Sequence, residues 1–241
     1  MRYAILSDVH GNFPAFEAVW QKIQEKGADA VYSCGDIIGY GPHPCECIAF
    51  AREKGIVSVA GNNDMAAVES FYMKKLNDTA KQAVVWTTKH IHETDVNFLK
   101  ELPMTLAVHD ATIVHSGSFE PKEFHYLDSY ANVARDLEAQ TSRVAFIGHT
   151  HIAAAYRWHA ENLFRIDDRT VELDEQGKYL INCGSVGQPR DRDARASFVI
   201  YDTDKNTVDF LRAEYDIERT VCDIAKTDLP PLLGARLKQG W

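Results

Sequence analysis

The sequence has little of what marks secreted, disulfide-rich or membrane-spanning proteins. Its five cysteines are an odd number without a repeated paired spacing, and "CEC" at 45–47 is not a zinc-knuckle pattern. Reduced thiols in a cytoplasm fit this usage best. The N-terminal "MRYAILSD" passes into charge after a handful of apolar residues, and no later run approaches the length of a membrane span. We therefore expect a soluble, unsecreted, cytoplasmic protein without a membrane partner.

Positive charge is also scarce. The chain has 26 Lys and Arg against 35 Asp and Glu, which gives a formal net charge of -9. Nucleic acids and anionic membranes are bound by fields of Lys and Arg, so an extended surface for either is not expected. Any phosphate that this protein binds needs a local source of positive charge.

No internal repeat, linker or low-complexity segment interrupts the 241 residues, 45% of which are hydrophobic. We therefore predict a single domain spanning residues 1–241. Short apolar runs that end in small or polar residues predict buried strands at 3–8, 30–36, 56–62, 112–117 and 144–150. Helical periodicity predicts helices over 14–27, 42–55, 78–93 and 128–140. Alternating strands and helices favour βαβ units.

The second half of the chain has a different pattern. Apolar runs separated by turns at "DEQGK" (174–178) and "DTDKN" (202–206) predict antiparallel hairpins rather than crossovers. These hairpins would form a second sheet stacked on the first. The tail from Ile217 is predicted to be helical and then frayed.

Each of the five strand-like runs in the first part ends in a side chain that can bind a metal. Function gathers at the carboxyl edge of an open α/β sheet, so we expect these side chains at one edge of one sheet. Taken singly, each has an ordinary explanation as a helix cap or a polar turn residue. Jointly they predict a cluster of Asp8, His10, Asp36, Asn62, His115, His149 and His151.

The ligand types indicate the chemistry. Carboxylate, imidazole and amide ligands without thiolate suit Mn, Fe, Zn, Co or Ni, among which we expect Mn to support activity. Seven ligands exceed the need of one ion, and two ions that share a carboxylate can activate water and clamp a phosphate for in-line displacement. Two dications against the two aspartates would leave a local charge of about +2, which would attract a phosphate into an acidic protein.

The motifs "DVH" (8–10), "GDIIGYG" (35–41), "GNND" (61–64), "VHSG" (114–117) and "GHTH" (148–151) resemble, in order and spacing, the five blocks of the calcineurin-like metallophosphoesterases. The segment "NCGSVGQPR" (182–190) looks like the small prokaryotic phosphodiesterase-like branch of that family. The resemblance implies a four-layer α/β/β/α sandwich of two mixed sheets flanked by helices. It also implies Asp8, His10 and His151 on one metal, Asn62, His115 and His149 on the other, and Asp36 bridging both.

The chain departs from the family pattern at Asn63, where many members carry a His that protonates the leaving group. An amide can hydrogen-bond a phosphate oxygen, but it cannot act as a general acid near neutral pH. Asp64, which orients that His in the family, is here either a member of a catalytic pair with Asn63 or only a turn and capping residue. His43 or His125 could supply the proton instead.

Other residues have two readings each. Tyr40 and Arg190 are candidates for substrate binding, although a Gly- and Pro-rich turn and a charged, solvated loop also explain them. His125 is either above the site on a lid or an exposed loop residue. Cys34 is expected to be buried packing, and His90 and His92 surface residues.

The function we predict is a dinuclear phosphoesterase in which a metal-bound hydroxide attacks phosphorus, with a phosphate-ester small molecule or a nucleotide as substrate. The alternative is a metal-stabilised scaffold of the same fold that binds proteins without significant catalysis. A metal-binding regulator has no DNA-reading element or basic face to support it. The sequence leaves open whether the protein forms oligomers.

Overall fold

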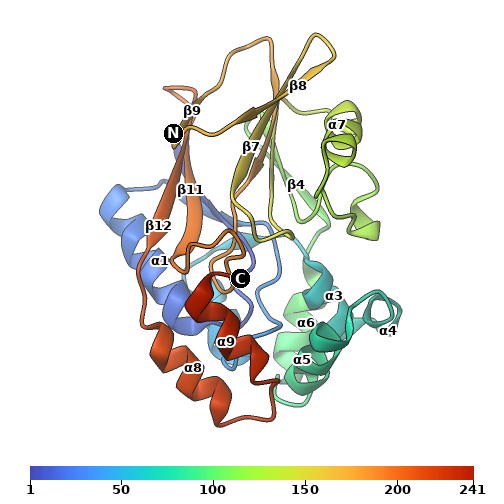
Figure 1. The fold of residues 1–241 in the computed structure, drawn as a ribbon, viewed down its shortest axis with the longest axis vertical. Coiled ribbons are helices and arrows are strands. Elements are labelled where there is room, and N and C mark those ends of the chain that lie inside the picture. The colour runs from blue at the N-terminus through green and yellow to red at the C-terminus, as the bar shows by residue number, and fades with distance from the viewer.

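The computed structural model describes residues 1–241 and contains two six-stranded sheets that pack face to face (Figure 1). In spatial order, the first sheet comprises β3 (Val57–Ser58), β2 (Ala30–Ser33), β1 (Arg2–Leu6), β11 (Ala196–Asp202), β12 (Thr207–Ala213) and β9 (Thr170–Glu172). The second comprises β4 (Thr105–Val108), β5 (Ala111–Val114), β6 (Val144–Ile147), β10 (Lys178–Asn182), β7 (Ala154–His159) and β8 (Asn162–Ile166). Both sheets are mixed, because β1–β2–β3 and β5–β6–β10 are parallel and the remaining pairs are antiparallel.

Three buried clusters define the layers. Ile5 and Val199 of the first sheet meet Phe146 and Ile181 of the second in the interior between the sheets. The helices α1 (Phe13–Lys26) and α2 (Pro44–Glu53) pack on the outer face of the first sheet, and α7 (Tyr130–Ala139) packs on the outer face of the second. Figure 1 shows α1 and α7 on opposite sides of the sheets. The predicted four-layer α/β/β/α sandwich is therefore confirmed.

The helix α1 illustrates how local sequence determines an element. Its buried residues Phe16, Val19 and Ile23 recur at helical spacing and face the sheet. The side chain of Asn12 accepts a hydrogen bond from the backbone N–H of Ala15 at 3.3 Å, which caps the first turn. Gly27 follows the last turn with φ of 71°, a conformation that costs glycine little.

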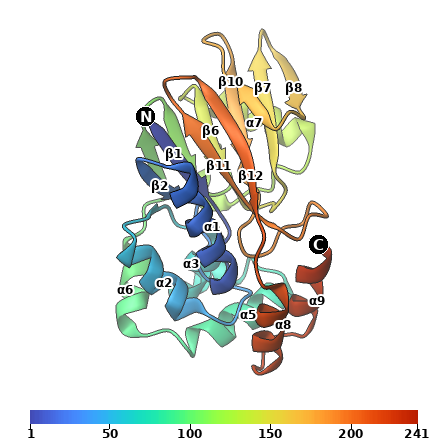
Figure 2. The ribbon, with the colours of Figure 1, turned by 90° about the vertical axis from the view of Figure 1, so that its left-hand side faces the viewer.

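The remaining helices gather at one end of the sheets, as Figure 2 shows. They are α3 (Asn62–Val68), α4 (Ser70–Met73), α5 (Asp78–Thr88), α6 (Glu93–Glu101), α8 (Ile217–Ala225) and α9 (Leu232–Gln239). A short 3₁₀ helix, η1 (Pro121–Glu123), lies in the loop that follows β5. No helix combines the length and the apolar character that crossing a membrane requires.

The strand ends belong to two sheets, which contradicts the expectation that they share the edge of one sheet. The loops after β1, β2 and β3 leave the first sheet, whereas those after β5 and β6 leave the second. The reason is a non-local pairing: β11, from the C-terminal part of the chain, pairs with β1. The parallel strands of the first half are thus divided between two sheets whose carboxyl ends meet.

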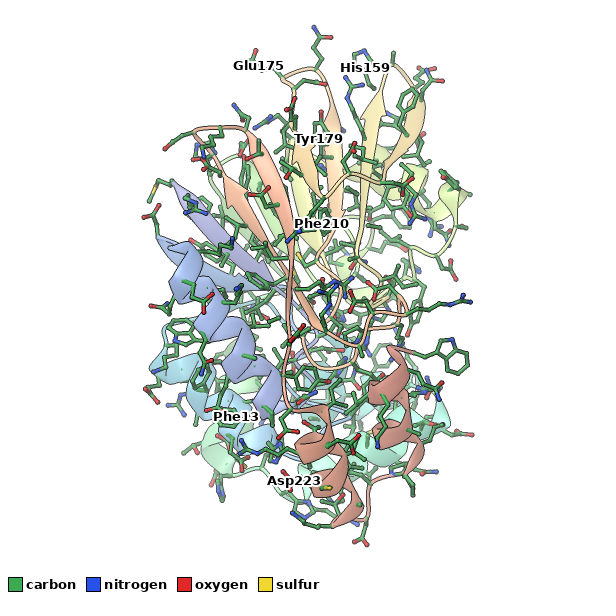
Figure 3. The ribbon with its side chains drawn as sticks, turned by 60° about the vertical axis from the view of Figure 1, so that its left-hand side comes forward. Phe13, His159, Glu175, Tyr179, Phe210 and Asp223 are labelled. Atoms are coloured by element: carbon green, nitrogen blue, oxygen red, sulfur yellow. The ribbon has the colours of Figure 1, made fainter.

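The prediction of a hairpin at "DEQGK" is also wrong. The predicted hairpin at "DTDKN" is confirmed, because this turn joins β11 to β12. Around "DEQGK", β9 pairs with β12 in the first sheet and β10 pairs with β6 and β7 in the second. This segment therefore crosses between sheets. Figure 3 places Glu175, in that turn, at the end of the molecule opposite to Asp223 on α8. The strand β7, which forms a hairpin with β8, had no predicted counterpart.

Two helical predictions need correction. The helix expected over 78–93 ends at Thr88, and the capping side chain of Asp95 starts α6 by accepting from the backbone N–H of His92 at 3.0 Å. The tail is not frayed, because Leu233 and Leu237 of α9 are buried in a cluster with Tyr40. The Thr220 hydroxyl of α8 also donates to the Asn12 side chain at 2.9 Å.

Candidate metal centre

Loops from both sheets interlock where their strands end. The backbone N–H of Asp8 donates to the carbonyl of Gly35 at 3.0 Å, which joins the loops after β1 and β2. The backbone N–H of His149, after β6, donates to the Asp8 carboxylate at 2.9 Å. Each sheet therefore supplies part of a single cluster. All seven side chains that the sequence predicted are in this region, and all except the half-buried Asn62 are buried.

The backbone of these loops is held in an unusual conformation. Five of the seven predicted ligands have φ between 51° and 65°, in the left-handed region that non-glycine residues seldom adopt: Asp8, His10, Asp36, His149 and His151. Such conformations persist where the surrounding structure imposes them, and they concentrate at functional sites. The same turns direct these side chains toward one another.

Two glycines let backbone approach the carboxylates closely. A Cβ atom on Gly148 would lie 2.1 Å from Oδ2 of Asp8 and 1.9 Å from Oγ of Ser7. A Cβ atom on Gly61 would lie 2.0 Å from Oδ1 of Asp36. The glycines of "GHTH" and "GNND" are therefore required by space around the cluster.

Three donor atoms converge in the first part of the cluster. Nε2 of His10 and Nε2 of His151 are 3.0 Å apart, and they lie 3.5 and 3.3 Å from Oδ1 of Asp8. Ligands about 2.1 Å from a tetrahedrally coordinated ion are about 3.4 Å apart, so this triangle has the size that one cation needs. We name it the Asp8 triangle.

A second triangle lies beside the first. Nε2 of His115 is 3.0 Å from Oδ1 of Asn62 and 3.5 Å from Oδ2 of Asp36. The same Asp36 oxygen is 3.7 Å from Nε2 of His10, which belongs to the Asp8 triangle. Asp36 therefore lies between an imidazole of each set. We name Asn62, His115 and the predicted third ligand His149 the Asn62 triangle, and we count Asp36 in neither triangle.

Hydrogen bonds to the backbone orient three of the imidazoles. Nδ1 of His10, His115 and His151 lies 3.1, 2.8 and 2.6 Å from the carbonyl oxygens of Ile38, Cys34 and Gln188. A carbonyl only accepts, so each Nδ1 carries a proton, and each of these rings in its neutral form presents a lone pair at Nε2. Metal-binding histidines are commonly oriented in this way.

Burial and neighbouring charge determine protonation in the cluster. Burial, with the charge of Arg190 next in size, lowers the pKa of His151 to about 3. Burial and then His115 place the pKa of His149 well below its usual range. Burial opposes ionisation of Asp8, but His151 and His10 outweigh it and hold its pKa well below normal. Burial lowers the pKa of His115, but the charges of Asp36 and Asp8 outweigh it and raise that pKa above its ordinary value. His149 and His151 are therefore the neutral imidazoles beside the ionised Asp8, and these are forms that bind a cation.

The donor set fits divalent metal ions. Nε2 of His149 and Oδ1 of Asp8 are buried without any hydrogen-bond partner, which is costly for polar atoms. In the Asp8 triangle, moreover, the neutral Nε2 atoms of His10 and His151 would present lone pairs to one another at 3.0 Å. A cation between them would remove both costs. Imidazole, carboxylate and amide ligands suit first-row transition metals such as Mn, Fe, Co, Ni and Zn.

Asp64 forms more hydrogen bonds than a residue that only caps a turn would need. It is fully buried, and its carboxylate accepts from the backbone N–H groups of Asp36 at 2.8 Å, Ile38 at 3.2 Å and Gly61 at 3.0 Å. Burial and then the charge of Asp36 raise the pKa of Asp64 to about 7. Asp64 therefore holds the Asp36 loop in place.

Asn63 faces Asp36 rather than open space. It is 2% exposed, its backbone N–H donates to Asp36 at 2.8 Å, and its side-chain amide donates to the other oxygen of Asp36 at 2.6 Å. The expected contact between Asn63 and a substrate stays a prediction.

Two other predicted residues adjoin the cluster. The ring of Tyr40 is buried with its centroid 4.5 Å from that of His10, and the guanidinium of Arg190 lies 5.6 Å from the Tyr40 ring. Arg190 is half-buried, and its guanidinium donates to Oε1 of Gln188 at 2.8 Å. It is thus not on a fully solvated loop.

The alternative proton donors have partners of their own. Nε2 of His43 is 3.2 Å from the carboxylate of Asp223 on α8, and Nε2 of His125 is 3.0 Å from that of Glu120. His90 and His92 are exposed and Cys34 is fully buried, as predicted.

Sequence reasoning missed two aromatic residues in the loop after β5. The ring of Tyr126 lies over that of His149, with centroids 4.1 Å apart and planes 31° apart. The ring of Phe124 is 5.7 Å from that of His115. The aromatic content of "FEPKEFHYL" was the only available signal, and it pointed equally to packing.

Comparison with known proteins agrees with this architecture. A family model described as "Calcineurin-like phosphoesterase superfamily domain" matches residues 1–206. An uncharacterized protein of Methanocaldococcus jannaschii is 33% identical over 241 residues, which cover 98% of this chain and 97% of that protein. A symmetrical bis(5'-nucleosyl)-tetraphosphatase of Vibrio campbellii is 27% identical over 139 residues, 56% of this chain and 50% of that protein.

Among solved structures, a metallophosphoesterase from Sphaerobacter thermophilus is 34% identical and superposes with a TM-score of 0.87 over 100% of both chains. A hypothetical protein from Pyrococcus horikoshii has the same fold at 21% identity, with a TM-score of 0.79 over 100% of this chain and 98% of that one. Because the family model covers most of the sequence and the fold is shared throughout, the chain belongs to the calcineurin-like phosphoesterase superfamily.

Proposed function

We propose that this protein is a metal-dependent phosphoric ester hydrolase that uses two divalent ions to cleave phosphodiester, phosphoanhydride or phosphomonoester bonds. The observation that carries the proposal is the position of Asp36, whose Oδ2 atom lies 3.5 Å from an imidazole of the Asn62 triangle and 3.7 Å from one of the Asp8 triangle. His149 would complete the Asn62 triangle, because its unpaired Nε2 has no partner in the protein.

Each part of the cluster has a defined task in this proposal. Bound divalent ions supply Lewis acidity, which lowers the pKa of water and neutralises charge on phosphate oxygens. The chain holds the imidazoles through their Nδ1 bonds, keeps Asp36 in place through Asp64, and limits water by burying the cluster. Arg190 adds a guanidinium beside Tyr40, where it could pair with a phosphate oxygen.

The reaction we favour needs no strong proton donor for the leaving group. Asn63 cannot act as an acid, and both His43 and His125 are paired with carboxylates. A positioned acid is typically worth about 10²- to 10⁴-fold, so unactivated alkyl monoesters should be poor substrates. Diesters and anhydrides, including those of nucleotides, are the favoured class. The name of the Vibrio campbellii relative agrees with a nucleotide anhydride.

Hydrolysis of bis(p-nitrophenyl) phosphate tests the proposal. We expect turnover with Mn²⁺, loss of turnover after chelation and recovery when Mn²⁺ is restored. The Asp36→Asn variant should be inactive under all three conditions. A protein that binds Mn²⁺ without hydrolysing this diester, p-nitrophenyl phosphate or a dinucleoside polyphosphate would instead support the protein-binding scaffold.

A further inference from the structure

A cavity of about 250 Å³ adjoins the candidate metal centre. Two proposed ligands of the Asn62 triangle, Asn62 and His149, are among its lining residues. Four aromatic residues line it as well: Tyr40, Tyr72, Phe124 and Tyr126. The cavity is therefore next to the candidate metal centre and has four aromatic side chains among its eleven lining residues.

The aromatic walls touch both parts of the metal centre. The ring of Tyr126 lies over that of His149, with centroids 4.1 Å apart and planes tilted by 31°, and the ring of Tyr40 lies 4.5 Å from that of His10. Phe124 packs edge-on against Tyr72, with centroids 5.5 Å apart and planes 68° apart. A phosphate held between the two triangles would thus have its substituent directed into an aromatic enclosure.

Three of the four rings are fixed and one is accessible. Tyr40, Tyr72 and Phe124 are each 7% exposed, whereas Tyr126 is 47% exposed. Lys75, between α4 and α5, forms an ion pair with Glu123 of η1 at 2.6 Å, which links the two segments that carry Tyr72 and Phe124. The three buried walls are therefore preorganised, and Tyr126 is the one exposed ring among the four.

We propose that this cavity binds a planar aromatic group of the substrate, either a nucleobase or a phenolic ring. The inference rests on the proposed function, since it places the phosphate on the metal centre. Pockets for drug-sized ligands measure about 300–1,000 Å³, so this cavity has room for one ring system rather than a whole dinucleotide. Stacking on aromatic side chains favours any flat ring and excludes no particular base.

Calorimetric binding of matched ligands to the Mn²⁺-loaded protein tests this inference. Adenosine 5'-monophosphate and ribose 5-phosphate carry the same phosphate on the same hydroxyl, and they differ in the base. We expect adenosine 5'-monophosphate to bind about 5- to 150-fold more tightly, which is the range that one stacked base contributes. In Tyr126→Ala that ratio should fall toward one, because adenosine 5'-monophosphate loses far more affinity than ribose 5-phosphate.

Tyr130→Ala is the matched control. Tyr130 is a similarly exposed tyrosine, at 59%, but it packs against Tyr156 rather than lining the cavity. The variant should keep the wild-type ratio. Phenyl phosphate distinguishes the two sources of the ring: binding as tight as that of adenosine 5'-monophosphate indicates a phenolic ring, and weaker binding indicates a nucleobase.

Equal affinities of the wild type for adenosine 5'-monophosphate and ribose 5-phosphate would overturn the inference. So would a Tyr126→Ala variant that weakens both ligands equally, because the ring would then act on the phosphate site. Failure of the proposed function has a separate signature, namely the absence of Mn²⁺-dependent hydrolysis of bis(p-nitrophenyl) phosphate by the wild type.

Discussion

The two ends of β6 carry polar clusters that differ in how completely their atoms are paired. Before the strand, the guanidinium of Arg143 donates to Asp110 at 2.6 Å and to Asn206 at 2.8 Å, and the Tyr201 hydroxyl donates to Asp110 at 2.6 Å. After the strand, Asp8 and His149 each have a buried atom without a partner. The first cluster is fully paired within the protein, whereas the second leaves buried polar atoms that the proposed cation would pair.

The difference shows how a polar cluster can be assigned to stability or to function. A fully paired network orders the segments that it joins, which here are the turns before β6, after β4 and after β11. Buried lone pairs that face one another weaken the fold unless a ligand relieves them. Left-handed backbone occurs in both clusters, at Asn206 and His109 in the first and at five residues of the second, so pairing rather than backbone conformation separates them.

The largest effect should follow from removing the carboxylate shared by the triangles. Asp36→Asn should lower kcat/KM with bis(p-nitrophenyl) phosphate by more than about 100-fold, because even residues that only support metal ligands typically contribute 10- to 100-fold. Elemental analysis should show a loss of bound metal. Asp110→Asn, in the paired network, should keep metal content and kcat/KM. Normal metal content in Asp36→Asn would contradict the shared position.

Next in size is the removal of one imidazole. His115→Ala should weaken Mn²⁺ binding about 10- to 100-fold or more at the Asn62 triangle, since it deletes a ligand rather than a supporting group. His149→Ala should affect the same ion, whereas His10→Ala and His151→Ala should affect the other. Calorimetric titration of each variant with Mn²⁺ measures this pairing.

His109→Ala provides the control for these histidines. His109 also has positive φ and lies near β5, but it is 51% exposed in its side chain and paired with Asp110. Its removal should leave both Mn²⁺ affinities unchanged. If His109 rather than His115 proved necessary for binding, the reading of "VHSG" as a ligand motif would be wrong.

A smaller effect should come from crowding the loops. Gly148→Ala would push a Cβ atom into Ser7 and Asp8 and should lower stability by about 1–3 kcal/mol, in the range of overpacked cores. Mn²⁺ should bind more weakly as well. Gly177→Ala lies in the turn at the opposite end, where its Cβ would meet the flexible Arg157 side chain at 2.9 Å. Urea denaturation should show the larger loss for Gly148→Ala; equal losses would contradict the spatial argument.

The contribution of the paired network to folding stability should depend on pH and not on bound metal. Burial opposes ionisation of Asp110, but His109, Tyr201 and Arg143 outweigh it and lower its pKa to about 2. Because the folded pKa is depressed, the ionised carboxylate stabilises the fold above about pH 4, and this contribution disappears as the pH falls toward 2. Asp110→Asn should therefore cost about 1 kcal/mol at pH 7, a value limited by solvent exposure. A urea-midpoint difference that did not shrink below pH 4 would contradict the assignment.

How far the sequence predicts this molecule depends on whether a feature is local. Strand ends and ligand types follow from short motifs, which is why the sequence alone predicts that Asp8, Asp36 and His151 lie together. Sheet membership depends on strands far apart in sequence, such as β1 and β11, and no local pattern encodes it. The division of the ligands between two sheets was missed for that reason.

Supporting residues were harder to predict than ligands. Asp64 adjoins Asn63 in sequence, but its acceptance of three backbone N–H groups depends on how the loop after β2 folds over α3. Tyr126 contacts His149 across two loops of the second sheet. The crossing at "DEQGK" looked like a hairpin because the turn chemistry of a hairpin and of a sheet-to-sheet connection is the same.

A crystal structure of the Mn²⁺-loaded protein, with anomalous scattering from the metal, tests the central claim most directly. We expect two anomalous peaks about 3.5–4 Å apart, the spacing typical of two-metal sites. One should be bound by Asp8, His10 and His151, the other by Asn62, His115 and His149, with Asp36 touching both. A single peak, or two peaks that do not share Asp36, would contradict the account.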